Sequence, residues 1–445
     1  MTTRRRFLQT GSALAATGAI SNFVITGAKQ VAAQDKNTEK NDRLGIGQIG
    51  CGGQGNGDTA GAARFGDVIA VCDVDSKRAA ASNANPAIGK GKAKVLSDYR
   101  KLLETPGIDL VVIGTPDHWH VKIAIEALMA GKHVYCEKPL TLTIAEGQAI
   151  TRAVKKFGKT FQVGTQQRSG GEFQKAVALC HAGRLGKIQK MTVAIGGGPK
   201  GGPFKKETPP ADLNWDMWLG QAPLVDYIPK RCHYEFRWWL EYSGGKMTDW
   251  GAHHVDIAHW AIGANDTGPV SFEGTADWPV KMERGYPTAD DQYNSALTFN
   301  IKCQFKDGPE MIICDKGPDF GNGILIEGDQ GRIFVARGSL KGKPVEDLAS
   351  NPLPEGAIKK LYKGNDPTGH MQNFFHCIKS GGEPVSDVFS HHRAMSSCHL
   401  ANIAIRVGRK LTWDPANEKI VGDEEAAKFL SREQRKGYEI PVNFA

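Results

Sequence analysis

Disulfide chemistry is not expected of this chain. Its nine cysteines are scattered singly over 445 residues and form no C-x-x-C pair and no regular framework. Four of them, Cys51, Cys72, Cys136 and Cys314, fall where apolar strands or tight turns are expected, and there a thiol behaves as a small hydrophobic group. We therefore interpret the cysteines as structural.

Concentrated positive charge is also missing. The formal net charge is +8, but Arg4, Arg5, Arg6 and Lys29 lie in an N-terminal segment that contains no acidic residue. The other charges are dispersed, and no run rich in lysine and arginine is interleaved with aromatic residues. Nucleic acid is therefore not expected as a partner.

The first 33 residues lack an uninterrupted apolar run. Residues 3–9 read TRRRFLQ, a twin-arginine pattern, and residues 11–28 are only weakly apolar, which makes them marginal as a membrane span. Small residues before Gln34 predict a signal peptide over residues 1–33 that is cleaved there; an uncleaved anchor is the alternative. We expect export by the twin-arginine route to the periplasm or another extracytoplasmic compartment. Residues 34–42 are interpreted as a linker.

The sequence contains no internal repeat. A chain of 445 residues is longer than one hydrophobic core usually accommodates, so we expect two domains. The first, over residues 43–163, alternates short apolar runs with helical patterns and predicts an α/β fold with a doubly wound parallel (Rossmann) sheet. Its strands are expected at 44–49, 67–73, 93–96, 108–113, 132–136 and 160–163.

After Gly164 the strands become closely spaced and are joined by short turns, which is typical of antiparallel pairing. Residues 164–410 therefore predict an α+β substrate and oligomerisation domain with a large, mostly antiparallel sheet, and residues 411–445 a charged tail. The elements expected are strands at 187–195, 291–301, 309–315, 323–327 and 331–335, and helices at 172–182 and 390–407.

Glycine is abundant where the first strand ends. Residues 43–55 read RLGIGQIGCGGQG and place Gly50, Gly52 and Gly55 at the G-x-G-x-x-G spacing. Such glycines allow a tight turn, the approach of backbone amides to a pyrophosphate and close packing of helix on strand. Asp73 follows at the end of the next strand, where a carboxylate can bind an adenosine ribose. A loop without a ligand is the alternative. The predicted dinucleotide site comprises Gly50, Gly52, Gly53, Gln54, Gly55 and Asp73.

Two later strands also end in polar residues. In IDLVVIGTPDHWH (108–120), Thr115, Pro116 and His120 are expected beside the cofactor, although Thr115 and Asp117 could instead cap the next helix.

The second of these strands ends in the sequence HVYCEKPL (133–140). Burial of the charged side chains of Glu137 and Lys138 costs free energy unless they are paired or have a function. We expect Lys138 to point into the interdomain cleft and to polarise a reacting hydroxyl or carbonyl. A structural ion pair with Glu137 is the alternative.

A further cluster occupies residues 243–260, SGGKMTDWGAHHVDIAHW. On one helix, Asp249, His253, Asp256 and Trp260 would share a face. Asp249 would orient His253, and His253 would accept a hydroxyl proton. The alternatives are histidines that serve helix packing, or a divalent metal held by Asp249, His253 and another histidine. The spacing lacks the H-E-x-x-H form, so no metal is expected.

In this order, the glycine turn, the TP-x-H-x-H turn, the EKP element and the G-G-x-x-x-D-x-G-x-H-x-x-D helix resemble the Gfo/Idh/MocA oxidoreductases over residues 43–410. The resemblance implies an NAD(P)-dependent enzyme that forms a homodimer or homotetramer. NAD is favoured because Asp73 would repel a 2′-phosphate, although Lys77 and Arg78 follow it. The implied catalytic residues are Lys138, Asp249 and His253, and the implied nicotinamide contacts are Thr115, Pro116, His120, Glu137 and Lys138.

A tryptophan-rich insertion has no counterpart in smaller members of that family. Its aromatic residues could stack on sugar rings, but packing is the favoured interpretation because large aromatic side chains dominate buried area. The residues in question are Trp215, Trp218, His233, Arg237, Trp238 and Trp239. The candidate substrate contacts are Arg168, Arg237 and His254.

We expect hydride transfer between a nicotinamide and a secondary alcohol or hemiacetal carbon of a sugar, polyol or glycoside. An exported protein meets no free dinucleotide pool, so the cofactor should be tightly bound and recycled. The alternatives are redox-neutral glycoside cleavage, through transient oxidation, elimination and re-reduction, and a non-catalytic carbohydrate-binding protein.

Overall fold

The computed structural model describes residues 43–444. The predicted signal peptide and linker, residues 1–42, lie outside this described part. Within it, no helix combines the length and the apolar character needed to cross a bilayer.

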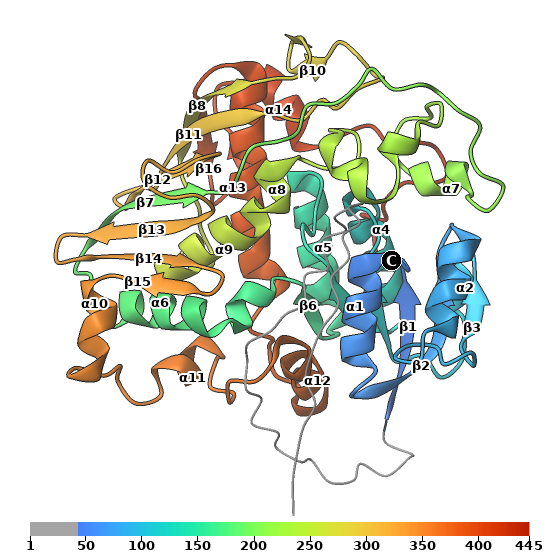
Figure 1. The fold of residues 1–445 in the computed structure, drawn as a ribbon, viewed down its shortest axis with the longest axis horizontal. Helices are drawn as coiled ribbons and strands as arrows, with labels where there is room; N and C mark the ends of the chain where they lie inside the picture. The colour runs from blue at the N-terminus through green and yellow to red at the C-terminus, as the bar shows by residue number, and fades with distance from the viewer. Residues whose placement is uncertain (1–42, 445) are drawn as a thin grey trace, which may run out of the picture. The chain divides into compact units, whose positions relative to one another are not determined.

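The first sheet has six parallel strands, as the sequence predicts (Figure 1). Its order is β3-β2-β1-β4-β5-β6, so the order reverses between β1 and β4, where ligands of such sheets bind. Strand β4, LVVI, is wholly apolar and buried because helices cover both faces of the sheet. The strands are β1 (Leu44–Ile49), β2 (Gly66–Cys72), β3 (Lys94–Leu96), β4 (Leu110–Ile113), β5 (His133–Cys136) and β6 (Phe161–Val163). The helices between them are α1 (Gly53–Ala62), α2 (Ser76–Ala84), α3 (Tyr99–Leu103), α4 (Asp117–Met129) and α5 (Ile144–Phe157).

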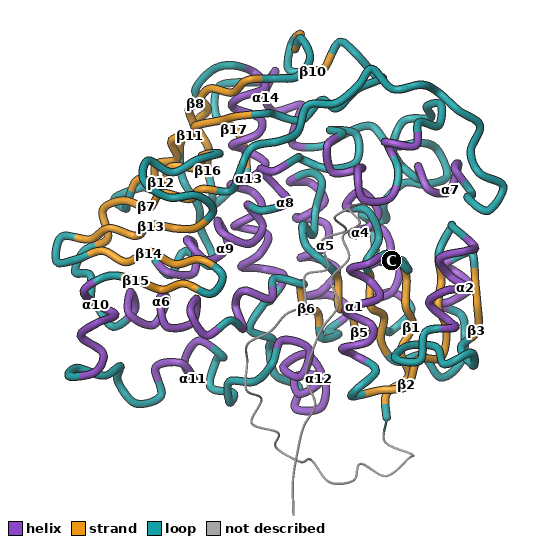
Figure 2. Tube along the Cα trace, in the orientation of Figure 1, coloured by secondary structure: helices purple, strands orange, loops and turns teal. Residues whose placement is uncertain are grey.

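The second sheet has nine strands in the order β15-β14-β13-β7-β12-β11-β8-β16-β17. Every pair of neighbours is antiparallel except β7 and β12, so the predicted mostly antiparallel sheet is confirmed. Figure 2 shows the two sheets as separate groups of strands with helices between them. The strands are β7 (Ile188–Ala194), β8 (Ser271–Asp277), β11 (Thr298–Gln304), β12 (Glu310–Cys314), β13 (Gly323–Gly328), β14 (Arg332–Ala336), β15 (Ser339–Lys341), β16 (Leu411–Asp414) and β17 (Lys419–Ile420). A separate hairpin joins β9 (Met282–Glu283) to β10 (Tyr286–Pro287).

The strand expected at 291–301 was placed wrongly. Its first part forms no strand, because the backbone amides of Tyr293 and Asn294 donate to Gly201 and Trp238, outside the sheet. Strand β11 begins only at Thr298.

Helices that follow β6 in the chain cover both sheets. Helices α6 (Gly171–His181), α9 (Gly251–Ala261) and α13 (Val388–Val407) contribute to the core of the nine-stranded sheet. Helix α12 (His370–Ser380) instead packs Phe374 and Phe375 into the core of the first sheet.

Two further segments reach the first domain. In the tryptophan-rich insertion, the backbone around Asp212 and Asn214 bonds to Ser76 and Val74, just after β2. Residues 438–444 pack on α4 and α5: the ring centroid of Tyr438 lies 6.0 Å from that of Trp119, and that of Phe444 lies 5.7 Å from that of Phe157. The carbonyl of Glu439 accepts a hydrogen bond of 2.9 Å from Lys122.

Candidate active site

The glycine-rich turn after β1 leaves the N-terminus of α1 accessible. Gly50 has a φ of +90°, which favours glycine, and an added Cβ would lie 2.6 Å from Gly114. A Cβ on Gly55 would lie 2.1 Å from the carbonyl oxygen of Gly50. Gly52 is the N-cap of α1 and has no side-chain cap; a Cβ there would approach the Arg78 guanidinium at 3.3 Å. The free backbone amides of this helix end suit a pyrophosphate.

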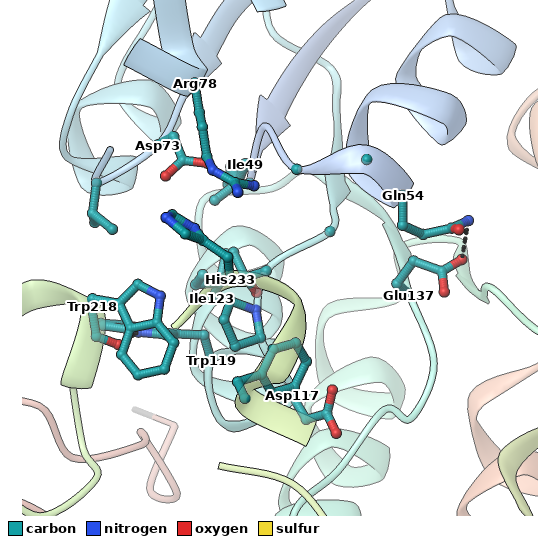
Figure 3. Close-up of a pocket in the computed structure, with 18 of the residues that line it drawn as sticks. Ile49, Gln54, Asp73, Arg78, Asp117, Trp119, Ile123, Glu137, Trp218 and His233 are labelled. Atoms are coloured by element: carbon teal, nitrogen blue, oxygen red, sulfur yellow. Dashed lines mark hydrogen bonds between the residues drawn. The ribbon is translucent and has the colours of Figure 1, made fainter. Parts of the chain in front are cut away.

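A cavity of about 470 Å³ lies beside this turn, at the carboxyl ends of the first sheet (Figure 3). Its volume is typical of small-molecule and cofactor sites. Of the predicted cofactor residues, Gly55 and His120 do not line it. The predicted residues that line it are Gly50, Gly52, Gly53, Gln54, Asp73, Thr115, Pro116, Glu137 and Lys138, with Arg237 and Asp249.

Asp73, Arg78 and His233 gather at one end of the cavity (Figure 3). The Asp73 carboxylate accepts hydrogen bonds from the backbone amides of Cys51, at 2.7 Å, and Asp75, at 2.9 Å. Burial raises the pKa of Asp73. The carboxylate therefore braces the glycine turn and still faces the cavity, as a ribose-binding group requires.

Lys138 and Asp249 meet at another part of the cavity wall. The Lys138 Nζ donates to Asp249 Oδ1 at 2.8 Å and to the Asp249 carbonyl oxygen at 3.2 Å. Burial raises the pKa of Asp249, but the nearby cations Lys138 and Arg237 outweigh it and leave this pKa below its ordinary value. The alternative Lys138–Glu137 ion pair is wrong: Glu137 Oε2 instead accepts from the Lys138 backbone amide.

The expected single helix through Asp249 and His253 is wrong. Helix α8 (Lys246–Asp249) ends before Trp250, and α9 starts at Gly251, although Trp250 keeps a helical φ of −93° and ψ of −27°. Asp249 is bonded to Lys138, and the buried Nδ1 of His253 has no hydrogen-bond partner among the described residues. Burial, with the charges of Lys138 and Arg337, holds the pKa of His253 well below its ordinary value, so its imidazole is neutral. Within residues 43–444, no group of three or more His, Cys, Asp or Glu side chains is placed to hold a metal ion.

Glu137 is buried behind Lys138 in a second polar group. Its Oε1 accepts from Gln166 at 2.7 Å and from Gln54 at 3.4 Å, the bond drawn in Figure 3. Burial raises the pKa of Glu137 and of its neighbour Asp58. Glu137 therefore fixes Gln54, at the start of α1, to the end of β5.

The turn after β4 places Asp117, which the sequence predicts only as a possible helix cap, in the cavity wall. Asp117 lines the cavity and accepts a hydrogen bond from the Ser243 hydroxyl, and burial raises the pKa of Asp117 to about 7. Pro116 is the N-cap of α4 and no side chain caps this helix, so the capping alternative is wrong. His120 lies outside the cavity, with its ring nitrogens 2.7 Å from the Pro139 carbonyl oxygen and 2.9 Å from that of Thr115.

Two of the candidate substrate contacts are wrong. Arg168 is 2% exposed and forms a bidentate ion pair with Asp256, at 2.6 and 2.8 Å. His254 is fully buried between Gln167 and Asn322. Both residues hold elements together, and the sequence could not show this because their partners lie 68 to 88 residues away.

The insertion supplies the wall opposite the first domain. Trp215 and Trp239 are buried in its own aromatic cluster, as the packing interpretation predicts. Trp218, His233 and Arg237 also line the cavity, together with Tyr234 and Phe236, which sequence reasoning missed. These positions follow no periodic pattern, so no sequence signal identifies them.

Comparison with protein families places both halves of the chain in one group. Residues 44–165 match the Gfo/Idh/MocA model described as "Oxidoreductase family, NAD-binding Rossmann fold". Residues 202–440 match the companion model, "Oxidoreductase family, C-terminal alpha/beta domain".

Individual proteins with similar sequences include scyllo-inositol 2-dehydrogenase (NAD(+)) of Bacillus subtilis, which is 26% identical over 304 residues, 66% of this chain and 75% of that protein. Other curated relatives align over 27–41% of their own length.

Solved structures share the fold. Aldose-aldose oxidoreductase from Caulobacter crescentus, complexed with glycerol, has a TM-score of 0.60 at 18% identity, covering 83% of this chain and 99% of that one. Levoglucosan dehydrogenase, in complex with NADH and L-sorbose, has a TM-score of 0.60 at 19% identity, covering 83% and 98%.

Proposed function

Because the chain belongs to the Gfo/Idh/MocA family of NAD-binding oxidoreductases, we propose that it is a dehydrogenase that acts on a secondary alcohol or hemiacetal carbon of a sugar, polyol or glycoside. The observation that carries this proposal is the Lys138–Asp249 pair, which lies in the same cavity as the glycine turn and Asp73.

The cavity fits a dinucleotide. The open amides at Gly52 and Gly53 suit its pyrophosphate, Asp73 suits a ribose hydroxyl pair, and the buried Thr115 hydroxyl has no partner among the described residues. When bound, the nicotinamide supplies the hydride acceptor or donor. Because Asp73 would repel a 2′-phosphate, NAD is the proposed cofactor.

Lys138 is the proposed electrophilic group. An ammonium has three N–H donors, and Asp249 accepts two of them. The third remains to donate to the substrate oxygen and to stabilise the charge that develops on it. In this mechanism Asp249 orients Lys138. His253 lies behind the residues that line the cavity, and its neutral imidazole, whose buried Nδ1 has no partner among residues 43–444, is the proposed acceptor of the hydroxyl proton.

We further propose that the cofactor stays bound and is recycled within each turnover. The insertion supports this, because its Asp212–Asn214 backbone is bonded to the segment after β2 and its His233 lies at the ribose end of the cavity. Protein purified without added dinucleotide should release NAD or NADH on denaturation, as detected by mass spectrometry. With a donor and an acceptor sugar both present, NADH should not accumulate. When the acceptor sugar is withheld, the bound cofactor should remain as NADH.

Absence of any dinucleotide in the released fraction would overturn tight binding. Continuous accumulation of NADH from added NAD would favour an ordinary dehydrogenase. Release of an aglycone without net NADH would identify the redox-neutral glycoside-cleaving alternative.

We also propose that residues 1–33 direct export through the twin-arginine route, since an internal cofactor can be acquired before a folded protein is transported. Replacing Arg4 and Arg5 by lysine should leave the protein in the cytoplasm, as measured by cell fractionation. Replacing Arg332, an exposed arginine of strand β14, by lysine is a control that should not alter export. Unchanged export of the Arg4→Lys, Arg5→Lys variant would contradict the proposal.

A further inference from the structure

The charges around Asp249 point to the chemical class of the substrate. We infer that the site takes a sugar that bears a carboxylate, held by Arg237, Lys246 and Arg337 while Lys138 faces the reacting oxygen. This inference rests on the proposed function, because it names the substrate of the same site.

Four cations lie near Asp249: Lys138 and Arg237, which line the cavity with it, and Lys246 and Arg337, which lie against Trp250 outside the cavity lining. Lys138 is 2.8 Å from Asp249 Oδ1, and the Arg237 Nε is 3.8 Å from the same atom. Lys246 lies three residues before Asp249 on the same short helix. Burial lowers the pKa of Lys246 and of Arg337, and the Asp249 carboxylate opposes that effect on both.

Lys246 and Arg337 have no acidic partner of their own. Among residues 43–444, neither side chain forms an ion pair within 4.0 Å. Both lie against Trp250: the Lys246 Nζ is 5.9 Å from its ring centroid, and the Arg337 guanidinium carbon is 4.7 Å from it. Two cations that lack an ionic partner and lie against the same indole can bind one shared anionic substituent.

The neighbouring carboxyl groups do not neutralise this cluster. Asp117 is buried against Ser243, and its raised pKa of about 7 leaves it largely without charge in mildly acidic solution. Glu137 is buried among Gln54, Gln166 and Asp58, and burial raises its pKa. The site therefore keeps an excess of positive charge where a neutral sugar would offer nothing to balance it.

A carboxylate fits this cluster better than a hydroxyl does. The planar guanidinium of an arginine can bind both oxygens of a carboxylate at once, and such charge-assisted bonds are about twice as strong as neutral ones. The same cations also stabilise the negative charge that develops on the reacting oxygen beside Lys138.

The test compares sugars that differ only at C6: D-glucuronate, D-glucuronamide and D-glucose, with the corresponding D-galacto series. Glucose 6-phosphate serves as an anion of a different class. Turnover is followed in the presence of NAD, and binding to the NADH-loaded protein is measured by calorimetry. We expect kcat/KM for a uronate to exceed that for its amide at least about tenfold.

Lys246→Gln and Arg337→Gln should each raise the KM for the uronate about tenfold relative to the KM for the amide, while any loss of kcat from the weaker positive field should be the same for both sugars and NADH affinity should change little. Lys343→Gln removes an equally charged lysine from the exposed helix α10 (Lys343–Glu346) and should change nothing. Equal use of uronate, amide and neutral sugar would overturn the inference, as would tighter binding of glucose 6-phosphate.

The outcome also separates this inference from the proposed function. If no sugar is turned over but the uronate binds, and the two glutamine variants abolish that binding, the carboxylate site stands and the dehydrogenase proposal fails. If neutral sugars are turned over and uronates are not bound, the dehydrogenase proposal stands and the carboxylate inference fails. Absence of both turnover and uronate binding would count against both.

Discussion

Replacing Lys138 by methionine is expected to lower kcat about a thousandfold while leaving NADH affinity close to that of the wild type. Methionine keeps the length of the side chain and removes the only side-chain group among residues 43–444 that donates to Asp249 within hydrogen-bond distance. Loss of one preorganised donor to a developing oxyanion costs roughly a hundredfold to a thousandfold in rate.

The matched control is Lys132→Met. Lys132 precedes the same strand, β5, but at its amino end, where its Nζ donates to the Ile108 carbonyl at 2.8 Å. Stopped-flow single turnovers measure the chemical step, and calorimetric titration measures NADH affinity. A Lys138→Met enzyme that retained more than a tenth of the wild-type rate would remove Lys138 from the chemistry.

Substituting alanine at two glycines of this segment should produce two different defects: lower stability at Gly55 and weaker dinucleotide binding at Gly52. Gly55→Ala is expected to lower the free energy of unfolding by about 3 kcal/mol, because its Cβ would lie 2.1 Å from the Gly50 carbonyl oxygen and force α1 away from β1. Gly52→Ala should leave stability within about 0.5 kcal/mol, since φ is −75° and the approaching atom belongs to the flexible Arg78 side chain.

The Gly52 variant should instead lose dinucleotide affinity by at least about tenfold, because its methyl group would stand where the pyrophosphate approaches the backbone. Denaturant unfolding of the protein freed of cofactor gives the stability, and calorimetry gives the affinity. If Gly52→Ala bound NADH as the wild type does, the pyrophosphate would not lie over this turn.

The first sheet could be predicted from the sequence because a strand buried on both faces is a continuous apolar run, as in Leu110–Ile113. Strand β8 was missed for the opposite reason. Its residues, SFEGTAD, are mostly polar and only partly buried, and the strand is defined by pairing with β11 and β16, which are distant in sequence.

The candidate site was predictable where a residue follows directly from a strand end. Asp73 and Lys138 both line the cavity for that reason. The expected bond from Asp249 to His253 is not formed, because Asp249 accepts from Lys138, 111 residues earlier, and a helix wheel cannot show such a partner. Arg168 carries a charge that is neutralised by Asp256, 88 residues later, and only tertiary structure reveals such a partner.

The packing of Tyr438 and Phe444 on α4 and α5 has a consequence for biosynthesis. These side chains cover helices that leave the ribosome about 300 residues earlier. The nucleotide-binding half therefore cannot acquire its full set of contacts during translation, although its own strands are complete early. Its final maturation must wait until the second half has been made, so the two halves reach their finished state together.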